Sequence, residues 1–259
     1  MTGGSRRVEE LSGPAFAATI RPESILVLPT GSIEQHGPHL PLATDLIMAS
    51  ELATRVVEAA AGAGLDAWLL PALGYTKSDE HAWAPGTMWL SAETLLAVVR
   101  DLGRSLADGG ARTLVFYNGH GGNTALLQVA LRELRRRFGL RTFLAGVGIP
   151  AGDGVDGPDE RGLGIHGGWG ETSLLMHLRP ELVDASRFAR AVPDRIAGFE
   201  RIGFAGRPVQ FGWLSSDFAG GVIGDPSGAS AEAGARIADR AVADGVAALE
   251  EVSRWPSTA

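Results

Sequence analysis

Apolar residues along this chain form short unbroken runs that alternate with longer stretches of helical periodicity. Unbroken runs of this length are typical of buried strands, and apolar residues at every third or fourth position indicate amphipathic helices. The pattern predicts strands at residues 24–31, 66–73, 112–123 and 141–148, the third running into a glycine turn, and helices at 45–64, 91–110, 124–139 and 230–252. Ser91 is the expected N-cap of the second helix.

The order of these elements predicts the fold class. Strands and helices alternate, and the strands are apolar throughout, which is typical of a parallel sheet covered by helices on both faces. We therefore expect an α/β fold with three layers, α/β/α, around a mostly parallel central sheet. No repeat or linker interrupts the pattern, so residues 1–259 are expected to form a single domain. The glycine-rich residues 149–170 are too polar for a core element and are predicted to form a functional loop or lid.

Composition narrows the range of partners and of metal ligands. With a net charge of −7 and a pI near 5.4, the chain is not expected to bind nucleic acid or an anionic membrane surface. It has no cysteine, so any metal must be held by nitrogen and oxygen. No run of about 18 apolar residues and no secretory signal occurs, so a cytoplasmic protein without a membrane span is expected.

Polar clusters follow the first three predicted strands. Glu34 and His36 come after the first strand, Glu80 and His81 after the second, and His120 after the third. In parallel sheets, ligand sites lie beyond the carboxyl ends of the strands. The topology therefore predicts that the three clusters meet at one edge of the sheet.

Five residues make up the predicted metal centre: Glu34, His36, Asp45, His120 and Glu171. Glu34 and His36 are two residues apart, so their side chains point the same way on an extended backbone. The mixed nitrogen and oxygen set suits Zn²⁺, Mn²⁺ or Fe²⁺ better than Ca²⁺. Because one catalytic zinc needs only three protein ligands, we expect two divalent ions that share Asp45 as a bridge. Such a pair would activate a bridging hydroxide for attack on an amide or lactam carbonyl.

Each motif also has a simpler explanation. The E-x-H motif alone could be an ordinary loop followed by Asp45 as a helix cap, and Glu171 could favour a helix N-terminus through its charge. The glycines around His120 could form a phosphate-binding loop, although the lysine typical of such loops is missing. His39 is a weak candidate ligand. The metal interpretation is preferred because the clusters are expected to converge.

Five ordered motifs resemble those of the creatininase family: GSIEQHGPHLPLATD, EHAWAPGT, YNGHGGN, HGGWGETS and GVIGDPSGAS. The resemblance implies an α/β/α fold, a dinuclear metal centre, a hexameric assembly and cleavage of non-peptide C–N bonds in small cyclic or linear amides. It also implies that Glu34 and His120 bind the first metal, that His36 binds the second, and that Asp45 bridges them. His166 matches the family histidine that assists proton transfer.

Two positions depart from creatininase itself. Gly122 stands where that enzyme has a glutamate that binds the second metal, and Gly162 stands where it has a tryptophan that closes over the substrate. Creatinine is therefore not the expected substrate. Family members with glycine at the first position include enzymes that act on formamide and peptide substrates. Glu171 is the predicted replacement for the missing ligand.

The remaining roles complete the hypothesis. His166 and Glu171 are the predicted catalytic residues, and Glu80, His81 and Trp169 are predicted to contact a small-molecule substrate. A homo-oligomer is expected from the resemblance. Two alternatives stay open: a lactone, formamide or peptide hydrolase on the same scaffold, and a non-catalytic, metal-stabilised oligomeric or binding protein.

Overall fold

The central element is a four-stranded parallel sheet in the order β2-β1-β3-β4. The structure, a computed structural model, describes residues 5–204 and 206–256. The strands are β1 (Ile25–Thr30), β2 (Ala67–Leu69), β3 (Thr113–Asn118) and β4 (Arg141–Gly146). The predicted α/β class with a parallel central sheet is confirmed.

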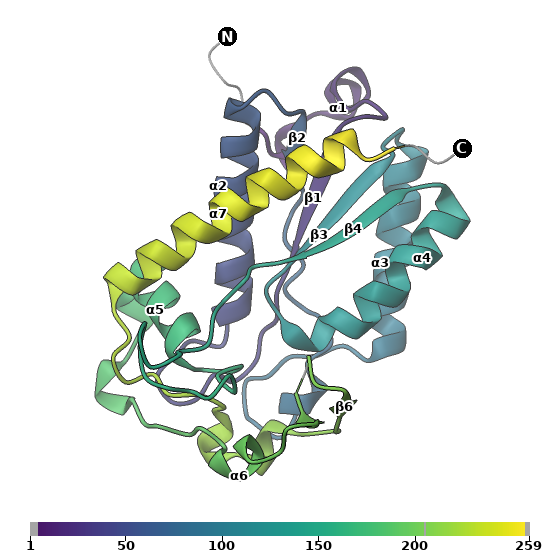
Figure 1. Cartoon of the computed structure of the whole chain (residues 1–259). Helices are drawn as coiled ribbons and strands as arrows, with labels where there is room; N and C mark the ends of the chain where they lie inside the picture. Colours follow the sequence, from purple (N-terminus) through teal and green to yellow (C-terminus); the bar gives the residue numbers. More distant parts are fainter. Residues whose placement is uncertain (1–4, 205, 257–259) are drawn as a thin grey trace.

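Helices cover both faces of the sheet (Figure 1). One layer contains α2 (Thr44–Gly62), α5 (Trp169–Leu178) and α7 (Ala231–Arg254), and the other contains α1 (Gly13–Thr19), α3 (Ala92–Asp108) and α4 (Thr124–Phe138). Successive residues of β1 enter different cores: Ile25 and Val27 pack under α2 and α7, whereas Leu26 and Leu28 pack under α3 and α4. This two-sided burial is the reason that the strands are apolar throughout.

The four predicted helices correspond to α2, α3, α4 and α7, and each boundary agrees to within about two residues. The Ser91 hydroxyl caps α3 by accepting a hydrogen bond from the Thr94 backbone N–H, and Ser230 caps α7 in the same way. The second strand is shorter than predicted, because the chain reaches Pro71, which has no N–H to donate to a sheet.

Several short elements were not predicted, and most lie between α5 and α7. They are α6 (Asp194–Ala197), β5 (Ile202–Gly203), β6 (Val209–Gln210) and the 3₁₀ helices η1 (Val8–Glu10), η2 (Asp79–His81), η3 (Gly121–Asn123), η4 (Pro180–Leu182), η5 (Ala185–Arg187), η6 (Ser215–Asp217) and η7 (Ala219–Gly221). None of the helices in the described ranges combines the length and the apolar character that a membrane crossing requires.

The strand order fixes where a ligand site can form. From β1 the chain moves to β2 on one side and then to β3 on the other side, so the connections diverge between β1 and β3. At such a switch point a crevice opens beyond the carboxyl ends of the two strands. The segment after β1 carries Glu34 and His36, and the segment after β3 carries His120.

The predicted loop at residues 149–170 contains no described helix or strand before α5 begins at Trp169. It is organised around Glu160, whose side chain is fully buried. The Glu160 carboxylate accepts hydrogen bonds from the backbone N–H groups of Gly152 (2.6 Å), Trp169 (3.0 Å) and Asp225 (2.6 Å). One carboxylate thus joins the loop, the start of α5 and the segment that precedes α7.

Glu160→Ala is expected to lower the free energy of unfolding by about 4 kcal/mol, because three backbone N–H groups would lose a charged acceptor in a buried place. Urea denaturation followed by circular dichroism measures this change. Asp153→Ala is the matched control, since Asp153 accepts two backbone hydrogen bonds on the exposed surface. We expect the control to lose less than about 1 kcal/mol, and an equally small loss for Glu160→Ala would contradict the prediction.

Candidate functional site

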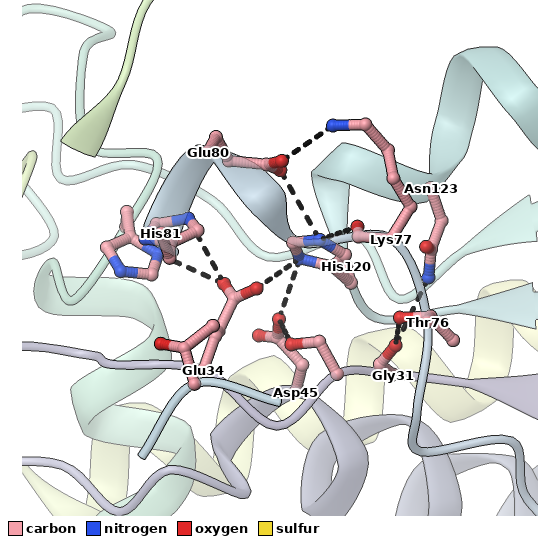
Figure 2. A network of polar contacts seen from close by, with 12 residues as sticks. Gly31, Glu34, Asp45, Thr76, Lys77, Glu80, His81, His120 and Asn123 are labelled. Atoms are coloured by element: carbon pink, nitrogen blue, oxygen red, sulfur yellow. Dashed lines mark hydrogen bonds and ion pairs between the residues drawn. The ribbon is translucent and has the colours of Figure 1, made fainter. Parts of the chain in front are cut away.

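Asp45 lies at the centre of the site, in the first turn of α2. Its Oδ1 is 3.1 Å from His36 Nε2, and its Oδ2 is 2.9 Å from His120 Nδ1. The helix approaches the end of β1 closely, since a Cβ atom on Gly31 would lie 2.5 Å from the backbone of Leu46. This approach inserts the Asp45 carboxylate between two imidazoles that come from different strand ends. Figure 2 shows its contact with His120.

Both imidazoles are oriented by backbone carbonyls. His36 Nδ1–H donates to the carbonyl of Glu34 (3.2 Å), so its Nε2 faces Asp45. His120 Nε2–H donates to the carbonyl of Lys77 (2.9 Å), so its Nδ1 faces Asp45. A hydrogen bond of this kind fixes the tautomer and the ring plane of a metal-binding histidine.

Glu34 is fully buried, and neither of its carboxylate oxygens accepts a hydrogen bond from the described residues. The nearest nitrogen atoms belong to His120 (3.3 Å), His81 (3.4 Å) and His166 (3.7 Å). Burial is the strongest influence on this carboxyl group and raises the pKa of Glu34 to about 8, although His120 opposes the shift. A buried carboxylate without donors is rare, and a bound cation would account for it.

His166 reaches the same cluster from the loop before α5. Its Nε2–H donates to the backbone carbonyl of Gln35 (2.7 Å), which leaves Nδ1 directed toward Glu34. Burial, together with the charge of His36 and then His81, lowers the pKa of His166 well below its ordinary value. This shift favours the neutral imidazole, whose Nδ1 is 3.7 Å from Glu34 Oε1.

Glu171 completes the predicted ligand set from the first turn of α5. Its Oε2 accepts a hydrogen bond from the backbone N–H of Gly167 (2.6 Å), and burial raises the pKa of Glu171 to about 7. Three groups of side chains have donor atoms within 4.8 Å of one another: Glu34 with Asp45 and His120, His36 with Asp45 and Glu171, and Glu34 with His36 and His166. All five predicted ligands thus come together, and their donor chemistry fits divalent zinc or manganese.

A large cavity, called the main pocket below, opens over this cluster and has a volume of about 910 Å³. Glu34, Asp45, His120, His166 and Glu171 line it on the sheet side, and Phe204, Phe211 and Trp213 line it on the other. Glu80, His81, Gly122 and Gly162 also line it. Trp169, the first residue of α5, is not among the lining residues. Its side chain is buried in the core, and its indole N–H donates to the Gly228 carbonyl (3.3 Å).

Three residues that support the site were not predicted from the sequence. The Ser32 hydroxyl donates to Asp45 Oδ2 (2.7 Å), and Lys77 supplies the carbonyl that orients His120. The Gln35 side-chain amide donates to His81 Nδ1 (3.0 Å) and to the Gly221 carbonyl (2.9 Å). Their only signal in the sequence is proximity to the motifs, since Ser32 and Gln35 flank Glu34 and Lys77 precedes Glu80.

His39 does not face the cluster, in line with its prediction as a weak ligand. Its Nε2–H donates to the carbonyl of Gly167 (3.1 Å) and lies 3.2 Å from the hydroxyl of Thr172. The side chain is buried, and burial lowers the pKa of His39 to about 4. It joins the loop after β1 to the start of α5.

Comparison with known sequences identifies close relatives. A family profile described as "Creatininase: Creatinine amidohydrolase" matches residues 9–249. A Mycobacterium ulcerans (strain Agy99) protein named "Mycofactocin precursor peptide peptidase" is 35% identical over 239 residues, which cover 89% of this chain and 85% of that protein. The "Creatinine amidohydrolase" of Pseudomonas putida is 36% identical over 200 residues, covering 70% of this chain and 74% of the relative.

Solved structures share the fold and include forms with metals. A structure described as "Creatininase Mn" superposes with a TM-score of 0.74 at 28% identity and covers 96% of this chain and 98% of its own. A creatininase variant of "Zn-Zn type" has a TM-score of 0.73 at 29% identity, with coverage of 96% and 98%. Manganese and zinc are thus the metals of these structural neighbours.

The stabilising contribution of His39 is expected to depend on pH. Its pKa is about 4 in the folded chain and 6.5 ordinarily, so the unfolded chain binds a proton first as the pH falls. The contribution is fully present above pH 6.5 and is lost as the pH falls toward 4, by about 3 kcal/mol in total.

We expect His39→Gln, which keeps a donor near the Gly167 carbonyl, to reduce the slope of unfolding free energy against pH by about one proton between pH 4 and 6.5. Urea unfolding of both proteins at steps of pH, each with a chelator present, measures the slopes. Identical slopes would contradict the assignment of this titration to His39.

Proposed function

This chain belongs to the creatininase family, and we propose that it uses a dinuclear metal centre at the ends of β1 and β3 to hydrolyse a C–N bond of an amide. The observation that carries the proposal is the position of Asp45. Each of its oxygens faces a different imidazole, and Asp45 belongs to two of the three possible donor groups. A carboxylate shared in this way suits a bridge between two cations.

The family's metals define the expected cofactors, two divalent ions that are Zn²⁺, Mn²⁺ or both, with Fe²⁺ as a further possibility by donor type. Glu34 and His120 would hold the first ion and His36 the second, with Glu171 as the last ligand of the second. Ions at these positions would lower the pKa of a water molecule and polarise the scissile carbonyl. The unsatisfied oxygens of Glu34 favour a cation beside it.

His166 is the proposed proton carrier. Its neutral imidazole has a free Nδ1 directed toward Glu34, in the lining of the main pocket. From this position Nδ1 would accept the proton of the attacking water and return it to the leaving nitrogen. Gln35 keeps the ring in this orientation through its backbone carbonyl.

Two classes of amide are candidate substrates for the main pocket. A small cyclic or linear amide is the first, as the family's activity suggests. A peptide is the second candidate, because relatives that are 35% identical are named as a peptide peptidase and because the main pocket of about 910 Å³ is large for a small ring. The lining residue Gly162 leaves space open, since a Cβ atom there would meet nothing within 4 Å.

The test is hydrolysis by zinc- or manganese-loaded protein of cyclic amides, formamides and short peptides, followed by mass spectrometry. We expect turnover of at least one class, and a loss of kcat of about 100- to 10,000-fold in His166→Ala with unchanged metal content. Asp45→Asn is the companion variant and is expected to lose metal and activity together. Silence of the loaded wild-type protein across the panel would support the non-catalytic alternative.

A homo-oligomer is also proposed, with a hexamer expected from the family. Tyr75, Trp83, Met88 and Trp89 are about half exposed on the segment between β2 and α3, and exposed groups of this kind mark protein interfaces. Light scattering coupled to size-exclusion chromatography is expected to give a multiple of the 27.0 kDa chain mass. Trp89→Glu should shift the protein to a smaller species. A monomeric wild-type protein would contradict the proposal.

A further inference from the structure

The backbone conformation of Gly122 does not require a glycine. It lies in η3, and its φ angle is not among the positive values that favour glycine. The space beside it is occupied instead: a Cβ atom there would lie 1.9 Å from Glu80 Oε1 and 2.5 Å from His120 Nε2. Real Cβ contacts are essentially never that short, so any side chain at position 122 would have to displace the Glu80 carboxylate and would also crowd the His120 ring.

The Glu80 carboxylate is held firmly in this space (Figure 2). Its Oε2 is 2.7 Å from Lys77 Nζ, and its Oε1 is 3.5 Å from His120 Nε2. The backbone is held too, because the Ser215 hydroxyl donates to the Glu80 carbonyl (3.2 Å) and itself accepts from the indole N–H of Trp83 (2.7 Å). Glu80 is thus fixed at both its carboxylate and its main chain.

Glu80 contacts His120 on the side of the ring that faces away from Asp45. His120 Nε2 lies between the Lys77 carbonyl at 2.9 Å and the Glu80 carboxylate at 3.5 Å, while Nδ1 faces Asp45 and Glu34. A carboxylate behind a histidine keeps the opposite nitrogen unprotonated and raises its basicity as a ligand. Of the groups around Nε2, the Glu80 carboxylate is the one that brings a negative charge.

We propose that Glu80 is a positioning residue for His120, and that Gly122 is required because Glu80 occupies the space of its missing side chain. The proposal rests on the proposed function only in that His120 binds a cation. In this proposal Glu80, from the loop after β2, and Gly122, from the loop after β3, together position His120.

Zn²⁺ affinity tests the first half of the proposal, measured by isothermal titration calorimetry on chelator-treated protein. Glu80→Ala is expected to bind Zn²⁺ about 10- to 100-fold more weakly than the wild type. Glu80→Gln, which keeps the size of the side chain but removes its charge, should show most of this loss. Asp79→Ala is the matched control, because Asp79 also pairs with Lys77 (2.7 Å) but is half exposed and makes no described contact with His120.

The proposed requirement for glycine at position 122 is tested by combining variants. Gly122→Ala should weaken Zn²⁺ binding about as much as Glu80→Ala, since the new methyl group displaces the carboxylate. The double variant Gly122→Ala/Glu80→Ala should be no weaker than Gly122→Ala alone, because neighbouring sites with one task are not additive. Thermal unfolding of each variant in chelator verifies that it folds.

The outcomes separate this proposal from the proposed function. Wild-type Zn²⁺ affinity in Glu80→Ala, or fully additive losses in the double variant, would overturn the positioning role even if the enzyme hydrolyses amides. Wild-type affinity in Glu80→Gln would also overturn it, because the negative charge would then not matter. Coupled losses of Zn²⁺ affinity would support it, whichever amides are or are not cleaved.

Discussion

The burial of one carboxylate between two imidazoles is the constraint on which the rest of the site depends. Asp45 can reach both His36 and His120 only because α2 begins directly against the end of β1, where Gly31 has no side chain to keep the helix away. The parallel order of β1 and β3 places the two histidines on either side of that helix terminus. The sheet topology therefore determines that the Asp45 oxygens face His36 and His120.

Burying this many ionisable groups is unfavourable unless each charge has an opposite charge nearby. Burial would raise the pKa of Asp45, yet the charge of His36 and the hydrogen bonds of both imidazoles hold it well below its ordinary value. Glu34 has no comparable set of donors, and its pKa moves in the other direction. The two carboxyl groups thus differ in proton affinity although both contact His120: Asp45 keeps its charge, whereas Glu34 holds a proton more tightly.

The architecture and the convergence of the candidate ligands could be predicted from the sequence because each depends on local signals. Strands that are buried on both faces are unbroken apolar runs, and residues such as Glu34, His36 and His120 stand directly after those runs.

The roles of Lys77, Gln35 and Glu160 could not be predicted in this way. Their hydrogen bonds cross between loops that are far apart in sequence, and the loop conformations are set by tertiary contacts. The position of Trp169 beneath α5 was missed for the same reason, since a tryptophan packs equally well in a core or in a pocket. The prediction that residues 149–170 act as a lid remains a prediction.

The Glu160 carboxylate has a consequence for exchanging loops among relatives of this chain. It joins Gly152 and Trp169, which are near it in sequence, to Asp225, which is 65 residues away, and all three donate through backbone groups that any residue except proline provides. The donors therefore leave no trace in an alignment, whereas the acceptor is a single residue. A graft of residues 149–170 from a homologue would carry the acceptor together with Gly152 and Trp169 but would separate it from Asp225. Such a chimaera would retain the sequence of the site and still lose the hydrogen bond that holds the loop to the segment before α7, so the transferable unit is the loop together with that segment.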